Sequence, residues 1–165
     1  MNATTILEHT AITHRIKRMA FQIYEFNAMA TEVYIAGIAG GGYDLAQLLA
    51  KALESISEIK VYLIQLTLDK NKPLSPAQTD IPLSDITGHS LVLVDDVLNS
   101  GTTLMYGIRH FLDIELSQFK TAVLVDRNHK KYPVKADFKG ISLSTSMNEH
   151  VKVAIQSQPY TVTLE

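Results

Sequence analysis

The sequence predicts an α/β fold, an open, mostly parallel twisted sheet flanked by helices, on three observations. Short runs of aliphatic and β-branched residues, such as 32–38 and 90–97, are typical of buried strands. Segments with helical apolar spacing, such as 10–26 and 43–55, alternate with these strands, as in parallel sheets. The chain has 165 residues and is 46% hydrophobic, so we expect one domain over residues 1–165.

Each element has its own signal. Residues 10–26 form a predicted helix because apolar residues recur every three or four positions, and Thr10 or Thr13 is its expected N-cap. Residues 69–88 contain three prolines and no clean periodicity, which predicts a long loop. The other predicted elements are strands at 32–38, 60–68, 90–97 and 119–127, helices at 43–55 and 101–113, a basic loop at 129–140, and short strands at 141–146 and 151–156.

Composition excludes several classes of protein. The net charge of −2 gives no general attraction to nucleic acids or membranes. The sequence contains no cysteine, which excludes disulfides and thiolate metal sites and fits a reducing, cytoplasmic setting. Its first twenty residues have no long apolar run, so we expect neither a signal peptide nor a membrane span.

The stretch LVLVDDVLNSGTT, residues 91–103, carries the main functional signal. A buried strand ends in two acids, Asp95 and Asp96, and in a parallel sheet ligands bind outside the carboxyl ends of the strands. We therefore expect both charges to point out of the core. The glycine and hydroxyl residues that follow lead into a helix, whose first amides attract anions. The pattern predicts a ribose-phosphate site; the alternative is that Ser100 or Thr102 only caps the helix and the acids bind a structural cation.

Two segments resemble a known family. VLVDDVLNSGTT is similar to the phosphoribosyl-pyrophosphate (PRPP) signature of the type I phosphoribosyltransferases. AVLVDRNHKKYPVKADFKG, residues 122–140, resembles the segment that follows in the PyrR branch, which combines a uracil phosphoribosyltransferase with a pyrimidine-operon attenuator. The order of elements agrees over nearly the whole chain. The resemblance implies the type I phosphoribosyltransferase fold with a small hood.

The resemblance also implies roles for residues. Asp95 and Asp96 would hold the ribose hydroxyls, with Mg²⁺ bound indirectly, through substrate and water. Lys70 and Lys72 would belong to a mobile lid, and Asp126 and Arg127 would face the base. Related enzymes have a cis peptide in the pyrophosphate loop, which predicts one at Ala39–Gly40. The residues expected to bind PRPP are Ala39, Gly40, Gly41 and Gly42 around pyrophosphate, and Val97, Leu98, Asn99, Ser100, Gly101, Thr102 and Thr103, of which the last five cradle the 5′-phosphate.

This chain departs from the PyrR pattern at three places, the first of which is the mobile loop, where PyrR has Tyr-Arg-Asp and this chain has Asp69, Lys70 and Asn71. The pyrophosphate loop of PyrR carries a Lys, a Thr and an Arg, where this chain has Ala39, Gly40 and Gly41. Lys17 and Phe21 replace a Thr and a His that serve RNA in the attenuators, so RNA binding is not expected.

Three functions follow as hypotheses. The first is a phosphoribosyltransferase that transfers the phosphoribosyl group of PRPP to uracil or a related base and releases pyrophosphate. The second is a regulator that binds PRPP or nucleotides with little catalysis. The third is a generic phosphate-binding α/β protein, which the paired acids and the long signature disfavour. We expect PRPP and a base or nucleotide as partners, in a homodimer or larger homo-oligomer.

Overall fold

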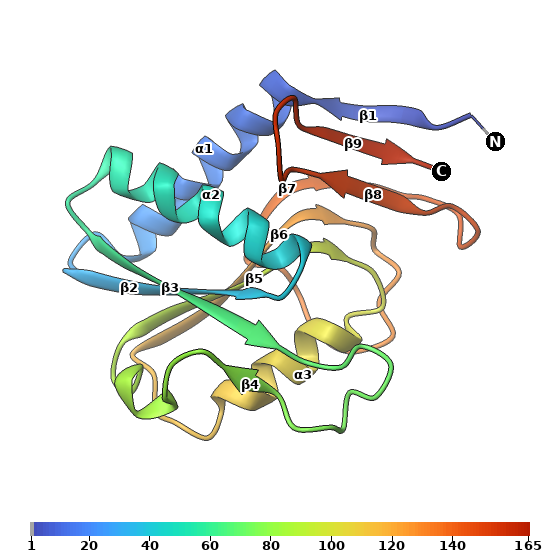
Figure 1. Ribbon diagram of the computed structural model, residues 1–165. Coiled ribbons are helices and arrows are strands. Elements are labelled where there is room, and N and C mark those ends of the chain that lie inside the picture. The colour runs from blue at the N-terminus through green and yellow to red at the C-terminus, as the bar shows by residue number, and fades with distance from the viewer. Residues whose placement is uncertain (1) are drawn as a thin grey trace.

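A computed structural model describes residues 2–165. Its main feature is a six-stranded sheet in the order β4-β3-β2-β5-β6-β7, in which only the short edge strand β4 is antiparallel to its neighbour (Figure 1). The predicted open, mostly parallel sheet is confirmed. Its strands are β2 (Glu32–Ile38), β3 (Lys60–Thr67), β4 (Gln78–Thr79), β5 (Ser90–Leu98), β6 (Gln118–Asp126) and β7 (Phe138–Ser142).

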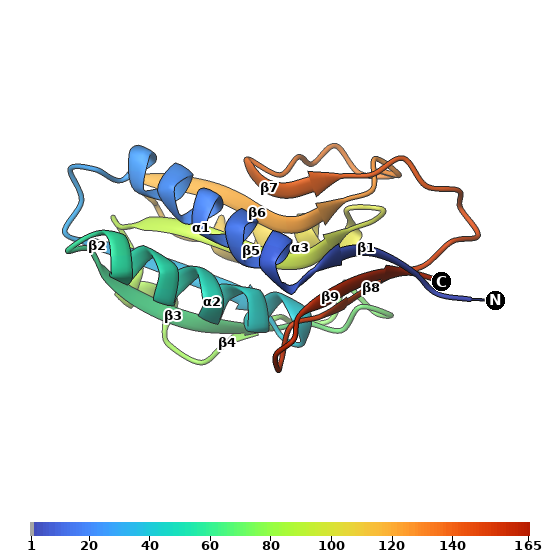
Figure 2. The same cartoon turned by 90° about the horizontal axis from the view of Figure 1, so that it is seen from above.

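Helices cover both faces of this sheet. α1 (His9–Phe26) and α2 (Gly41–Ile56) lie side by side on one face, and α3 (Thr102–Phe111) lies on the other (Figures 1 and 2). Each face has its own buried apolar cluster. Ile12 and Leu49 belong to the cluster under α1 and α2, whereas Leu104 and Phe111 belong to the cluster under α3. Within residues 2–165, no helix combines the length and hydropathy that a membrane crossing requires.

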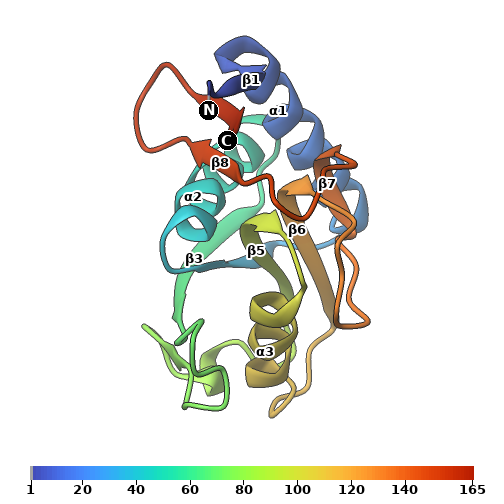
Figure 3. The same cartoon turned by 90° about the vertical axis from the view of Figure 1, so that its right-hand side faces the viewer.

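A second sheet forms the small hood that the family resemblance implies. Its strands β1 (Thr4–Glu8), β9 (Thr161–Leu164) and β8 (Val151–Ala154) are antiparallel, with β9 in the middle. The hood lies on the side of α1 and α2, beyond the carboxyl ends of the main strands (Figures 1 and 3). The sequence analysis missed β1 and β9. Most residues of β1 are exposed and most of β9 are partly exposed, so neither short strand has a long apolar pattern.

Several predicted elements differ from the structure, among them the strand expected at 141–146, which is β7 and ends at Ser142. The N-cap of α1 is Glu8, and Thr13 instead donates its hydroxyl to the His9 carbonyl oxygen at 2.9 Å. The predicted loop at 69–88 contains β4 and a 3₁₀ turn at Leu83–Asp85. The basic loop ends at Asp137, because β7 begins at Phe138, an almost fully buried aromatic residue.

The connections create a crevice between two neighbouring strands. From β2 the chain passes through α2 on one face to β3, and from β5 it passes through α3 on the other face to β6. The two paths diverge at the carboxyl ends of β2 and β5, which pair in parallel register. Such a divergence is where open α/β sheets bind ligands. The residues that follow β2 and end β5 therefore face the same crevice.

Candidate functional site

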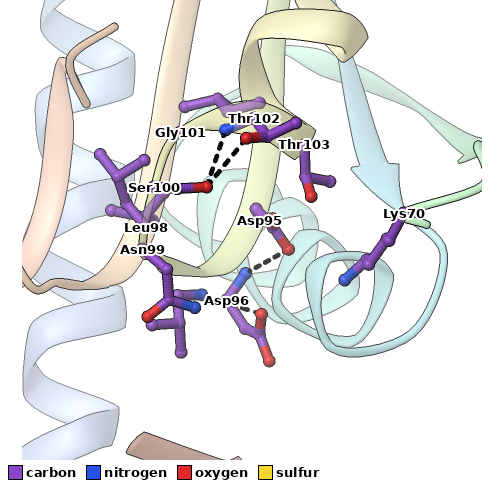
Figure 4. Close-up of a pocket in the computed structure, with 12 residues that line it drawn as sticks. Lys70, Asp95, Asp96, Leu98, Asn99, Ser100, Gly101, Thr102 and Thr103 are labelled. Carbon is purple, nitrogen blue, oxygen red and sulfur yellow. Dashed lines mark hydrogen bonds between the residues drawn. The ribbon is translucent and has the colours of Figure 1, made fainter. Parts of the chain in front are cut away.

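A partly open cavity lies at the carboxyl end of β5 (Figure 4). Every residue from Asp95 to Leu104 lines it, together with Lys70 and Val123. The cavity thus contains both predicted acids, the whole predicted phosphate loop and one of the two predicted lid lysines. Val123 and Leu104 were not predicted, because apolar residues of a strand and a helix give no separate signal for a site.

The two acids differ in their surroundings. Asp96 is partly exposed, whereas Asp95 is only 4% exposed, so the expectation that both charges point out of the core was wrong for Asp95. Asp95 Oδ1 accepts the backbone N–H of Asp96 at 2.9 Å, and Asp96 Oδ1 accepts that of Val97 at 2.8 Å. Burial, as the largest cause, and the neighbouring Asp96 charge together raise the pKa of Asp95 to about 7, although Lys70 opposes the shift.

This pKa shift predicts a pH-dependent stability of the ligand-free protein. Because the pKa of Asp95 is about 7 when folded and 3.8 in the reference state, the folded protein holds a proton that the unfolded chain releases between these values. The free energy of unfolding should therefore fall as pH rises through this window. We expect Asp95→Asn, which keeps an oxygen for the Asp96 N–H group, to melt at a higher temperature than the parent protein at pH 8 and at the same temperature at pH 4. Equal melting temperatures at pH 8 would argue against a buried, strained carboxylate.

The glycine loop after β2 packs directly on these acids. A Cβ atom on Gly41 would lie 2.0 Å from Asp96 Oδ2, and one on Gly42 would lie 2.7 Å from the Val94 carbonyl oxygen. Gly40 has φ 96° and ψ −136°, a conformation that side chains oppose, and it is the N-cap of α2. The expected cis peptide at Ala39–Gly40 was wrong for this structure, since within residues 2–165 only Gln158–Pro159 is cis.

The predicted phosphate loop joins β5 to α3 through a left-handed glycine. Gly101 has φ 84° and is the N-cap of α3. Ser100 Oγ accepts the backbone N–H of Thr102 at 3.3 Å and lies 2.9 Å from Thr102 Oγ1. Because the N-cap is Gly101 and has no side-chain cap bond, the alternative that Ser100 or Thr102 caps the helix was wrong, and the Ser100 bond is local to the loop. It occupies one amide, and the next amides of the first turn, which have no intrahelical acceptor, border the cavity.

We predict that Gly101→Ala weakens phosphate binding by about tenfold. Displacing the loop from its binding conformation costs about 1 kcal/mol or more, and this cost is subtracted from the binding free energy. A Cβ atom there would lie 2.5 Å from Val134 Cγ1, so the loop must shift. Gly88→Ala is the matched control, because Gly88 also has a positive φ, 80°, but its Cβ position is open and lies outside the cavity. Calorimetric titration with inorganic phosphate compares the two variants. Equal affinities would contradict a phosphate position at this loop.

The two lid lysines have different positions. Lys70 lines the cavity and points toward the acids, whereas Lys72 is not among the lining residues (Figure 4). Asp69 Oδ1 accepts the backbone N–H groups of Asn71 and Lys72 at 2.9 and 3.1 Å, which fixes the turn that presents Lys70. The sequence did not distinguish the two lysines, since both lie in the same polar loop.

Asp126 and Arg127, the predicted base-facing pair, are buried at the end of β6. Asp126 is 1% exposed and lies 3.8 and 3.6 Å from the Nζ atoms of Lys130 and Lys139. Arg127 donates to the carbonyl oxygens of Ser146 and Glu149, to Thr145 Oγ1 and to Asn99 Oδ1. Neither residue lines the cavity; Arg127 instead joins the phosphate loop to residues 145–149. Sequence reasoning missed this connection, although an arginine directly after a buried strand signals a need for acceptors.

Comparisons with known proteins identify the class that this fold and site define. The family model described as "Phosphoribosyl transferase domain" matches residues 2–158. The chain therefore belongs to the phosphoribosyltransferase family.

Its curated relatives narrow the assignment to the PyrR branch. It is 35% identical to the bifunctional protein PyrR of Microcystis aeruginosa over 92% of this chain and 89% of the relative. It is 37% identical to the bifunctional protein PyrR of Streptomyces coelicolor over 94% of this chain and 85% of the relative. Among solved structures, a hypoxanthine-guanine phosphoribosyltransferase from Bacillus anthracis has a TM-score of 0.80 at 17% identity, with both chains fully covered. A Trypanosoma cruzi hypoxanthine phosphoribosyltransferase has a TM-score of 0.79 at 17% identity, covering 98% of this chain and 91% of that one. At these identities, the structural matches show the shared fold.

Proposed function

We propose that this protein transfers the phosphoribosyl group of PRPP to uracil or a related nucleobase and releases pyrophosphate. The observation that carries the proposal is the cavity at the diverging ends of β2 and β5, where two acids and a phosphate-type loop meet. Ribose hydroxyls need acceptors and a 5′-phosphate needs amide donors, and this cavity has both in one place. Its PyrR relatives support the choice of a pyrimidine base.

Each group has a distinct task in this mechanism. Asp95 and Asp96 accept hydrogen bonds from the ribose hydroxyls, and residues 99–103 hold the 5′-phosphate. Ala39, Gly40, Gly41 and Gly42 do not line the cavity, but Gly41 and Gly42 lie against the acids, and we assign the amides of this loop to pyrophosphate on that proximity. The transition state resembles an oxocarbenium ion, so catalysis rests on positioning and electrostatics.

Magnesium fits this site as a companion of the substrate. Within residues 2–165, no group of three or more His, Cys, Asp or Glu side chains could hold a metal alone. Two carboxylates at the cavity suit an ion whose remaining ligands are substrate and water oxygens. Asp95 and Asp96 would hold it in this way, and the bound ion would neutralise charge on pyrophosphate.

The direct test is an assay with PRPP, Mg²⁺ and each nucleobase in turn. We expect a nucleotide and pyrophosphate to form in equal amounts with one or a few bases. Omitting the base should suppress both products, which controls for hydrolysis of PRPP. No nucleotide with any base would argue against the enzymatic proposal.

A PRPP- or nucleotide-binding regulator is the second candidate. It is favoured by residues 39–42, whose side chains carry no charge, so that Lys70 is the one lysine or arginine side chain lining the described cavity. Tight PRPP binding with no product in the assay above would select this candidate. RNA remains an unexpected partner, because exposed Phe21 and Lys17 replace the residue types of the attenuators.

A further inference from the structure

We propose that a groove between α1 and α2 is a second ligand site, for a small molecule that joins a planar ring to an anionic group such as a phosphate or a carboxylate. The groove is separate from the cavity of the proposed active site, since the two share no lining residue. The inference therefore goes beyond the proposed phosphoribosyl transfer and does not depend on it.

The groove is built from three segments that are far apart in the chain. Residues 9–17 of α1 and 48–55 of α2 supply its two walls, and Gln158 and Tyr160, from the turn between β8 and β9, close one end. The two helices lie side by side (Figures 1 and 2). The groove has a volume of ≈ 340 Å³, and small-molecule sites typically have about 300–1,000 Å³. A ligand of the size of a substituted ring therefore fits it.

The floor of the groove is apolar. Ile16, Leu48 and Ala52 line it and belong to the apolar cluster under the two helices or pack against that cluster. The rings of His9 and Tyr160 lie at one end, with centroids 4.6 Å apart and planes inclined by 51°. A flat apolar body such as an aromatic ring would remove its own faces and these side chains from water.

The charged side chains of the lining are lysines. Lys17 on α1 and Lys51 on α2 line the groove, whereas no Asp or Glu does. Within residues 2–165, neither lysine takes part in an ion pair. The nearby acids of the same elements, Glu8, Asp44 and Glu54, are absent from the lining. An anionic group is therefore the one that this lining complements.

The hydrogen-bonding groups of the groove also favour an anion. His9 Nδ1 accepts the backbone N–H of Tyr160 at 3.1 Å, so the proton of the neutral ring is on Nε2, which is a donor. Thr13 and Ser55 donate their hydroxyl protons to the carbonyl oxygens of His9 and Ala52 at 2.9 and 2.7 Å. These hydroxyls offer a ligand no proton, and His9 adds an N–H donor to the two ammonium groups.

The ring and the anion are needed together. Both lysines are exposed, and water and salt screen an exposed ion pair, so the lysines alone would hold an anion weakly. A neutral ring on the open floor would leave both lysines unpaired. A molecule with both parts gains contacts with the floor and the walls at once. We therefore expect it to bind more tightly than either part alone.

Phenyl phosphate and benzoate test this site, because they join one ring to a phosphate or to a carboxylate. Amide NMR shifts of the whole chain locate their binding. We expect both probes to shift residues 9–17, 48–55 and 158–160, and the tighter of the two identifies the anion that the site prefers. Phenol and inorganic phosphate, which supply the ring and the anion separately, should bind to the groove at least tenfold more weakly.

Variants test the two lysines and the floor. Lys17→Ala with Lys51→Ala should weaken both probes at least tenfold. The matched control is Lys72→Ala with Lys135→Ala, which removes the same charge from two exposed lysines outside the groove and should leave binding unchanged. Ala52→Glu keeps a strong helix former on α2 and adds a carboxylate to the lining, so we expect a folded protein that no longer binds either probe.

Three results would overturn the inference. Shifts scattered over the whole surface would mean adventitious probe binding only. Equal affinity of the groove for inorganic phosphate and phenyl phosphate would mean an unspecific basic surface. Self-association of the parent protein that Ala52→Glu abolishes, measured by sedimentation, would make the groove a contact between copies of the chain. None of these results affects nucleotide formation in the PRPP assay, so the two proposals fail separately.

Discussion

Replacing both acids of the cavity, Asp95→Asn with Asp96→Asn, should abolish PRPP binding while leaving the fold intact. Each carboxylate is proposed to accept ribose hydroxyls, and a hydrogen bond to a charged group contributes about 2 kcal/mol. Losing two such bonds lowers the affinity by roughly a thousandfold. The fold should survive, because the double change removes the repulsion between two neighbouring carboxylates and the cost of burying the Asp95 charge.

Calorimetry with PRPP and Mg²⁺ measures this effect, and thermal melting monitors the fold. The matched control is Asp85→Asn with Asp113→Asn, which changes the net charge equally at two exposed positions that do not line the cavity. We expect the control to bind PRPP like the parent protein. Unchanged affinity in the Asp95 and Asp96 double variant would contradict the ribose assignment.

The second large effect is expected at Lys70. Because Lys70 lines the cavity, its ammonium group can meet the charge that develops on pyrophosphate as the bond to C1′ breaks. We expect Lys70→Ala to lower kcat by roughly tenfold to a hundredfold while KM changes by less than about threefold, since the interaction strengthens in the transition state. Lys72→Ala is the control from the same loop and should keep kcat within about twofold.

Hydrogen exchange tests whether this loop acts as a lid. Thr79 pairs with Leu66, and Asp80 Oδ1 accepts the Gln65 backbone N–H at 3.0 Å, so residues near β4 should be protected without ligand. Residues 68–77 have few such bonds and should gain protection on adding PRPP and Mg²⁺. Strong protection of residues 68–77 without ligand, or a rise in KM with unchanged kcat for Lys70→Ala, would favour a rigid structural loop.

The sequence predicted the main sheet and the cavity because both depend on local patterns. Buried strands such as 32–38 have continuous apolar runs, and the acids with their following loop form one contiguous signature. The environment of those residues was not predictable in the same way. The burial of Asp95, the contact of Asp96 with Gly41 and the bond from Arg127 to Asn99 each join segments far apart in the chain. Single-sequence periodicity carries no information about such pairs.

The hood joins the two ends of the chain, which affects the order in which the molecule folds. Its middle strand, β9, pairs with β1, so that Thr4 lies opposite Leu164 (Figure 1). A contact between residues 160 positions apart closes nearly the whole chain into a ring and carries a large entropic cost of loop closure. The hood is therefore expected to form late during folding. Its buried residues Leu7, Val151 and Val162 belong to the apolar cluster under α1 and α2, so opening the hood would expose the core of that face to water. The two ends of the chain thus close one face of the core together, and removing either end should destabilise the ligand-binding sheet as well.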